Sequence, residues 1–276
     1  MLDFPVITFL GGGNMAGAMI QGLLRASCLP TQIRVSEPDA DKRLSLANDL
    51  GIGVYEHNCP ACAEADVVVI AVKPGVVGKV LLEIGPILQP QTLVISIAAG
   101  ISMAFMAEHL QSNQPIIRTM PNTPALIGAG ITVLFCGASV TEDQRQLASR
   151  IFSAVGEVAF LDDEALLNAV TALSGSGPAY VYLIAEALSD GGVACGLSRD
   201  LADRLTVQTL IGSARLLAET GKHPGQLKNQ VTSPSGTTLA ALYELEQAGV
   251  RGTLMAAVRA AWQRAKELSI KSLGGG

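Results

Sequence analysis

A glycine-rich stretch near the start of the chain has the residue types and spacing needed to bind phosphate groups. Gly11, Gly13 and Ala16, within "GGGNMAGAM", match the G-x-G-x-x-A form of the dinucleotide-binding fingerprint, directly after the apolar run Val6 to Leu10. The first glycine allows a tight turn, the second lets a pyrophosphate approach the backbone, and the alanine lets the next helix pack on the strand. The phosphates then meet the positive N-terminus of that helix. The order of strand, loop and helix therefore favours a dinucleotide site over an ordinary tight turn.

The stretch after the second apolar run, Ile33 to Val35, should face the adenosine ribose, and it gives conflicting indications. Glu37 is an acid where NAD enzymes bind the ribose diol, although it follows the loop by more than the usual interval of about 20 residues. Ser36, Lys42 and Arg43 could instead receive a 2′-phosphate, and the two cations also fit a solvated helix face. The sequence leaves NADP(H) and NAD(H) both open.

Three later loops each end an apolar run and could wall the reacting part of the cofactor. They are "AVKP" (Ala71 to Pro74), "SIAAG" (Ser96 to Gly100) and "MPNTPALIGAG" (Met120 to Gly130). In open α/β sheets ligands bind outside these carboxyl ends of the strands, so we expect the nicotinamide here. Each X-Pro step disfavours helix, so the third loop should be a stiff, irregular wall. Lys73 is open to a second reading, as an exposed lysine at a strand end.

The elements that must position these loops are short apolar runs separated by helical stretches. Runs that are apolar throughout are buried on both faces, which predicts a parallel, doubly wound α/β sheet. The pattern continues to about Leu161. Besides the two runs above, the expected strands are Asp66 to Val72, Leu93 to Ala98, Pro115 to Arg118, Ile131 to Phe135 and Glu157 to Leu161.

After Asp162 the β-branched runs disappear and the punctuation becomes helical. Pro178 fits the first turn of a long helix, and Ser198 fits an N-cap. We therefore expect a dinucleotide-binding domain over residues 1–161 and an all-helical domain over residues 162–276.

Two Ser/Gly-rich loops precede helices in this second part. Ser174 to Gly177 should form a flexible polar turn, and "VTSPSGTTLAALYELE" opens into a helix from about Thr237. The backbone N–H groups at such an N-terminus bind a carboxylate without an arginine. Both loops are equally consistent with ordinary helix caps.

The composition limits the classes of partner. Of the 276 residues 49% are apolar and only 16% are charged, which predicts extensive burial and a large subunit interface. A net charge of -5 argues against nucleic acid or an anionic membrane, because either would require a basic patch. No apolar run approaches the ~18 residues needed to span a bilayer. The opening "MLDFPVITFL" lacks a basic segment, so we expect no signal peptide and a cytoplasmic location.

The five cysteines indicate buried free thiols of a reducing compartment rather than a disulfide framework. "CPAC", from Cys59 to Cys62, would need a second pair or nearby histidines to hold a metal, and of the three histidines only His57 is close in sequence. We predict no metal site.

Seven of these motifs together resemble the pyrroline-5-carboxylate reductase family, with matching stretches from Leu10 to Leu268. They are "GGGNM", "AVKP", "SIAAG", "MPNTP", "SGSGPAY", "HPGQLK" and "VTSPSGTTLAALYELE", of which the last is the most specific. Ser235 departs from the family's usual Gly, Ala or Asn, and Glu37 departs from its usual hydroxyl or other small residue.

The resemblance implies reduction of a cyclic imine that carries a carboxylate, with NADPH or NADH as donor and proline as product. A protonated imine is already electrophilic, so the protein has mainly to orient it and exclude water. The resemblance implies that the N–H groups of Gly236, Thr237 and Thr238 bind the carboxylate, with the Thr238 hydroxyl near the ring nitrogen and Ser176 as a neighbour. It also implies a dimer of intertwined C-terminal helices, often assembling further, with each active site between the cofactor domain of one subunit and helices of its partner.

The site predictions for the cofactor follow the fingerprint and the strand ends. The candidate cofactor-binding residues are Leu10, Gly11, Gly12, Gly13, Asn14, Met15, Ser36, Glu37, Asn58, Ala71, Val72, Lys73, Pro74, Ala98, Ala99, Gly100, Pro121 and Asn122.

Two other functions fit part of the pattern. A β-hydroxyacid dehydrogenase shares the arrangement of a Rossmann domain followed by helices, but it normally uses a lysine on a C-terminal helix as its acid, where this chain has threonines and glycines. A non-catalytic dinucleotide-binding module would bind the cofactor without turnover. Motifs at several separate strand ends favour the reductase.

Overall fold

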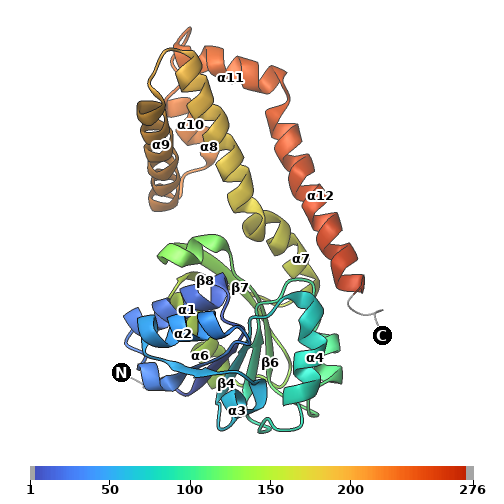
Figure 1. Cartoon of the computed structure of the whole chain (residues 1–276). Coiled ribbons are helices and arrows are strands. Elements are labelled where there is room, and N and C mark those ends of the chain that lie inside the picture. The colour runs from blue at the N-terminus through green and yellow to red at the C-terminus, as the bar shows by residue number, and fades with distance from the viewer. Residues whose placement is uncertain (1–3, 272–276) are drawn as a thin grey trace. The chain divides into compact units, whose positions relative to one another are not determined.

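An eight-stranded sheet organises the first part of the chain (Figure 1). Its strands lie in the order β3-β2-β1-β4-β5-β6-β7-β8, so the chain runs outward from β1 in one direction and then returns to build the other side. The doubly wound α/β fold is thereby confirmed. The computed structural model describes residues 4–271, and the strands are β1 (Ile7–Leu10), β2 (Ile33–Ser36), β3 (Gly53–Tyr55), β4 (Val67–Ile70), β5 (Leu93–Ser96), β6 (Ile116–Met120), β7 (Gly130–Cys136) and β8 (Gly156–Leu161).

The prediction of a parallel sheet is correct for strands β1 to β6 and wrong at β7. Strand β7 pairs antiparallel to β6, with Ile117 opposite Cys136, and β8 then runs parallel to β7. The connection from β6 to β7 contains only the 3₁₀-helix Thr123–Ile127, and a parallel crossover needs a dozen or more residues. Strand β3, which is short and half-buried, lacked the apolar run used to recognise the other strands.

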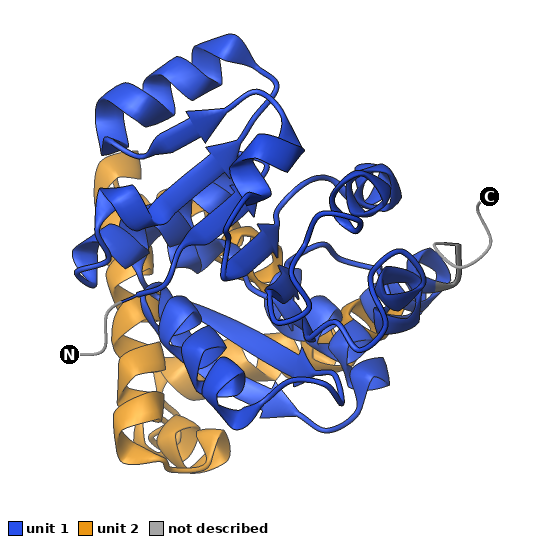
Figure 2. Ribbon diagram, turned by 90° about the horizontal axis from the view of Figure 1, so that it is seen from below, with its two compact units in different colours: residues 1–176, 261–276 blue, residues 177–260 orange. Residues whose placement is uncertain are grey.

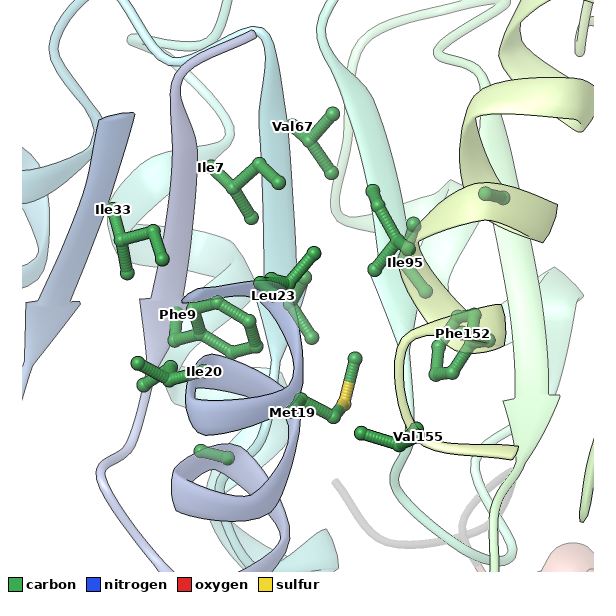
Figure 3. Packing of buried hydrophobic residues seen from close by; sticks show 14 of the residues in the cluster. Ile7, Phe9, Met19, Ile20, Leu23, Ile33, Val67, Ile95, Phe152 and Val155 are labelled. Atoms are coloured by element: carbon green, nitrogen blue, oxygen red, sulfur yellow. The ribbon is translucent and has the colours of Figure 1, made fainter. Parts of the chain in front are cut away.

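Two apolar clusters cover opposite faces of the sheet. Alternate residues of each strand point to opposite faces, so Ile7 and Phe9 belong to one cluster while Leu10 belongs to the other. Figure 3 shows the first cluster, in which Met19 and Leu23 of the helix after β1 pack with Ile7 and Phe9. Burial on both faces explains why the strands are apolar throughout.

The helices of this part cover those two faces. Helices α1 and α6 contribute to the first cluster, and helices α3, α4 and α5 contribute to the second. Their bounds are α1 (Asn14–Arg25), α2 (Ala40–Leu50), α3 (Asn58–Cys62), α4 (Pro74–Ile84), α5 (Met103–Glu108) and α6 (Glu142–Ser153), with the 3₁₀-helices η1 (Pro30–Gln32), η2 (Thr123–Ile127) and η3 (Glu164–Leu166).

The chain divides by its contacts into two units, which Figure 2 shows in different colours. One unit comprises residues 1–176 and 261–276, and the other comprises residues 177–260. The sequence placed the domain boundary after Leu161, whereas the first unit continues to Ser176. The difference arises because helix α7 (Leu167–Val170) still packs on β6 and β7. Near the end of the last helix, the Ser269 hydroxyl donates to Asn168 Oδ1 at 3.0 Å, so that segment also belongs with the sheet.

The part of the chain after α7 is helical, as the sequence predicts. Ser198 caps α9 by accepting a hydrogen bond from Leu201 N at 3.4 Å, and Pro178 lies in the first turn of α8. The helices are α8 (Gly177–Ala194), α9 (Arg199–Thr220), α10 (Pro224–Gln230), α11 (Thr237–Gln247) and α12 (Val250–Lys271). Between residues 4 and 271 no helix is long and apolar enough to cross a membrane.

Two neighbouring leucines of α4 allow a direct test of this packing. Leu81 is fully buried and Leu82 is 65% exposed. Leu81→Ala should lower the free energy of unfolding by about 2–5 kcal/mol, because it removes apolar contacts and leaves a cavity. Leu82→Ala should change it by no more than about 0.5 kcal/mol. Urea denaturation at equal protein concentration measures both, and similar losses for the two variants would contradict the packing described.

Candidate functional site

The first glycine of the loop lies in a conformation and a space that a side chain would disturb. Gly11 has φ 99, and a Cβ added to it would lie 2.9 Å from the carbonyl oxygen of Ala71. Its N–H donates to the Ser36 carbonyl at 2.8 Å, while Ala71 N donates to the Leu10 carbonyl at 2.9 Å. The turn is thereby fixed between the ends of β1, β2 and β4.

The start of α1 fits a pyrophosphate. Gly13 is the N-cap of the helix, and no described side chain caps it, so the first-turn N–H groups point toward the space above the loop. A Cβ added to Gly13 would meet no protein atom within 4 Å. Asn14 and Met15 are the first two helical residues. An anion can therefore approach backbone donors here, as the fingerprint requires.

The two ribose candidates lie at the end of β2. Ser36 is its last residue, and Glu37 follows it with only 7% of its surface exposed. The Glu37 carboxylate accepts a hydrogen bond from Gly12 N at 2.9 Å, so it lies directly against the glycine loop. Lys42 and Arg43 lie in the first turns of α2, with Lys42 exposed.

The predicted wall residues follow the next parallel strands. Ala71 and Val72 come after β4, exposed Lys73 is the N-cap of α4, and Pro74 is its first residue. The loop after β5 contains Ala98, which is buried, Ala99, which is exposed, and Gly100, which has φ 79. Because β1, β2, β4, β5 and β6 are parallel neighbours, their following loops meet at one edge of the sheet.

The loop after β6 is more regular than the two prolines suggested. Pro121 is buried, and Asn122 Oδ1 accepts a hydrogen bond from Ile131 N at 2.9 Å. Residues Thr123–Ile127 then form a 3₁₀-helix rather than an irregular wall. Pro124 is compatible with that helix because it lies in the first turn, where no N–H is required.

Asn58, another cofactor candidate, lies on α3, which follows β3. It begins α3, and its Nδ2 donates to Glu83 Oε2 of α4 at 2.8 Å. This bond joins two helices on the same side of the sheet, so the structure gives Asn58 a bracing contact.

A largely buried ion pair that the sequence analysis missed links β6 to η3. Arg118 Nη1 lies 2.6 Å from Glu164 Oε1, and the arginine side chain is only 6% exposed. The same carboxylate oxygen accepts from Met103 N at 2.7 Å, at the start of α5. The charge of Arg118 within an otherwise apolar strand was the signal in the sequence that could have revealed this pair.

The loop before α11 presents uncapped N–H groups. Gly236 is the N-cap, and no side-chain hydrogen bond caps the helix. Gly236 N donates to the Ser233 carbonyl at 3.1 Å. Ser235 has φ 56, a left-handed conformation that costs energy for a residue other than glycine. The loop therefore holds the N–H groups of Thr237 and Thr238 open to a ligand.

The segment around Ser176 is helical, and the expectation of a flexible turn there was wrong. Residues Thr171–Gly175 form a π-helical turn (η4) that continues α7, and Ser176 N donates to the Thr171 carbonyl at 2.8 Å. The Ser174 hydroxyl donates to the Val170 carbonyl at 3.1 Å. These hydrogen bonds to the preceding turn hold the segment in a helical form, although its Ser and Gly residues suggested a flexible one.

The cysteines do not form a metal site in the part of the chain described. Over residues 4–271 no group of three or more His, Cys, Asp or Glu side chains could hold an ion. Burial raises the pKa of the Cys62 thiol to about 12, and burial and neighbouring Glu83 raise the pKa of Cys59. Of the five cysteines only Cys28 and Cys62 are buried, and Cys195 is exposed.

A doubly wound sheet with an open glycine loop, followed by helices, is the architecture of many nicotinamide-dinucleotide-dependent oxidoreductases. Comparison with known proteins agrees. Residues 6–100 match the family described as "NADP oxidoreductase coenzyme F420-dependent", and residues 164–268 match "Pyrroline-5-carboxylate reductase dimerisation". The chain belongs to the pyrroline-5-carboxylate reductase family.

Individual relatives agree over nearly the whole chain. The pyrroline-5-carboxylate reductase of Pseudomonas aeruginosa is 44% identical over 97% of this chain and 98% of its own. The structure of a pyrroline-5-carboxylate reductase from Coxiella burnetii has a TM-score of 0.92 at 41% identity, covering 97% of this chain and 99% of its own. That of the Plasmodium falciparum enzyme, with NADP bound, has a TM-score of 0.88 at 32% identity, covering 98% and 100%.

The β-hydroxyacid dehydrogenase alternative receives no support beyond the fold. A 3-hydroxyisobutyrate dehydrogenase from Mycobacterium tuberculosis has a TM-score of 0.51 at 19% identity, and it covers 99% of this chain and 94% of its own.

Alanine at the two glycines should give different results. Gly11→Ala should lower the melting temperature of the cofactor-free protein, because the new Cβ meets Ala71 and the residue requires positive φ. Gly13→Ala should leave that temperature unchanged but weaken binding of NAD⁺ and NADP⁺ at least about tenfold, by filling the approach of the pyrophosphate. Scanning fluorimetry and calorimetric titration measure the two effects. Wild-type affinity in Gly13→Ala would show that phosphate does not bind at this turn.

Proposed function

We propose that this protein reduces 1-pyrroline-5-carboxylate to L-proline with a nicotinamide dinucleotide as hydride donor. Identity of 44% to the reductase of Pseudomonas aeruginosa across 97% of the chain carries this conclusion. The NADP oxidoreductase match and the relative with NADP bound support NADP(H) as a cofactor, with NAD(H) as the second donor to be compared.

The first unit would hold the dinucleotide. The uncapped N–H groups at the start of α1 would bind the pyrophosphate, with Leu10, Gly11, Gly12 and Gly13 forming the turn beneath it. The loops after β4, β5 and β6 would border the nicotinamide, with Asn58 as an additional candidate. When bound, the reduced nicotinamide supplies the hydride.

The loop before α11 would bind the substrate carboxylate. The N–H groups of Thr237 and Thr238 can hold an anion, since no side-chain hydrogen bond caps this N-terminus. The Gly236 N–H, which donates to the Ser233 carbonyl, would have to share that bond to join them. We assign the Thr238 hydroxyl to the ring nitrogen and Ser176 to a further substrate contact. The chain's residues would orient the protonated imine and exclude water, and the proposed chemistry requires no metal.

We also propose that unit 177–260 forms a dimer with its copy. Helix α8 is largely apolar, yet Ser189 is its one buried residue, and Val181, Tyr182, Leu183 and Leu188 are all about half exposed or more. A helix that is apolar on all sides is normally buried. A second chain carrying the same helices would cover this surface, in agreement with the dimerisation family matched by residues 164–268. The five cysteine thiols support a reducing, cytoplasmic setting.

The proposed role of Thr238 can be tested in the assay that defines the activity. Oxidation of NADH or NADPH should depend on pyrroline-5-carboxylate, and Thr238→Ala should lower kcat/KM at least about tenfold, or about 1.4 kcal/mol. Thr220→Ala is a matched control, because the Thr220 hydroxyl donates to the Leu216 carbonyl at 2.7 Å, at the end of α9 and outside the loop before α11. No turnover by the wild type would reject the proposed function, and wild-type rates in Thr238→Ala would reject only this residue's role.

The dimer proposal predicts that a charge on α8 disrupts assembly. Leu183→Glu should shift the protein to smaller species in sedimentation velocity, since Leu183 is 67% exposed within the apolar surface. Leu44→Glu serves as the control, because Leu44 is 61% exposed on α2 of the other unit. If the two variants sediment alike at wild-type size, Leu183 lies outside the interface.

A further inference from the structure

The Glu37 carboxylate is held in a fixed position beside the glycine loop by two backbone donors. Oε2 accepts from Gly12 N at 2.9 Å, and Oε1 accepts from Asp39 N at 3.1 Å. The residue is only 7% exposed. A carboxylate with both oxygens bonded to backbone N–H groups is oriented before any ligand arrives, and each oxygen retains a lone pair for a further hydrogen bond.

The nearest arginine is already engaged. Arg43 Nη1 donates to the carbonyls of Glu37 and Pro38 at 2.8 and 2.7 Å, and Nη2 lies 3.4 Å from Glu56 Oε2. These contacts hold the guanidinium against the backbone of the turn and beside the Glu56 carboxylate. Three of the five N–H donors of Arg43 are engaged in these contacts, so only two remain for a 2′-phosphate.

The remaining charges around the turn are mainly negative. Asp39 caps α2 by accepting from Lys42 N at 3.1 Å, and Asp41 lies in the first turn of that helix. Lys42 is the exposed cation of this turn. A phosphate placed here would therefore lie next to the buried Glu37 carboxylate and near two further acids, with one exposed lysine to offset them.

A ribose diol and a 2′-phosphate make opposite demands on this carboxylate. Two hydroxyl groups can donate to the free lone pairs of Glu37, whereas a 2′-phosphate is an acceptor that adds negative charge. Bringing two anions together where little water reaches them is unfavourable.

We infer that Glu37 binds the adenosine ribose diol and makes this reductase select NADH over NADPH. The inference rests on one part of the proposed function, namely that the cofactor is a nicotinamide dinucleotide. NADPH remains a donor that binds, but the 2′-phosphate weakens its binding relative to NADH. Ser36 and Lys42 would then contribute less to the choice of cofactor than Glu37 does.

The test measures binding of two nicotinamide-free fragments, ADP-ribose and 2′-phospho-ADP-ribose, by calorimetric titration of the full-length protein. The wild type should bind ADP-ribose at least about tenfold more tightly. Glu37→Ser and the isosteric Glu37→Gln should each reduce that preference at least about tenfold, mainly by improving binding of the phosphorylated fragment. Asp49→Ser removes an exposed acid of α2 that accepts from the Ser45 hydroxyl, and it should leave the preference within about twofold.

Each other result overturns the inference. Tighter wild-type binding of the phosphorylated fragment would do so, as would equal weakening of both fragments in the Glu37 variants, which would show that Glu37 only braces the loop. If neither fragment binds to the wild type, the inference is also refuted. Melting temperatures of the ligand-free variants show whether the loop remains folded. The fragments undergo no turnover, so selectivity can be found even if pyrroline-5-carboxylate proves not to be the substrate.

Discussion

The Gly11 amide donates to the Ser36 carbonyl, and the Leu10 carbonyl accepts from Ala71, so one turn joins the ends of three neighbouring strands. This close approach is possible because Gly11 has positive φ and no Cβ where Ala71 lies. The turn directs the chain into α1 with its first N–H groups uncapped. The proposed pyrophosphate site and the position of Glu37 both depend on this backbone contact.

Burial on both faces of the sheet makes that turn rigid. The strands beneath it supply alternate residues to two apolar clusters, one covered by α1 and α6 and the other by α3, α4 and α5. The loops at the carboxyl edge of the sheet therefore follow strands that cannot shift without disturbing a packed core. The ion pair of Arg118 and Glu164 adds a polar link between β6 and η3.

The helical unit, residues 177–260, differs from the sheet unit in how its apolar side chains are covered. Its helices carry apolar side chains that are exposed in the single chain, and the loop before α11 contains Ser235 in a left-handed conformation. Exposed apolar surface of this kind favours association, and a strained loop residue persists only where its surroundings hold it in place. Assembly and substrate binding are thus connected in our proposal through the same group of helices.

Much of this arrangement followed from local sequence. The glycine spacing, the apolar strands and the start of α11 at Thr237 depend on a few adjacent residues, so they were predictable. The antiparallel β7, the helical form of residues 171–175 and the two N–H contacts of Glu37 were not. An apolar run is the same whichever way its strand points, and a carboxylate in a sequence does not reveal which distant amide it will meet. The sequence by itself determined the class of fold and the family, because those depend on periodicity and motif. Only the tertiary structure decided strand direction, the buried ion pair and the orientation of Glu37, because these depend on contacts between residues far apart in the chain.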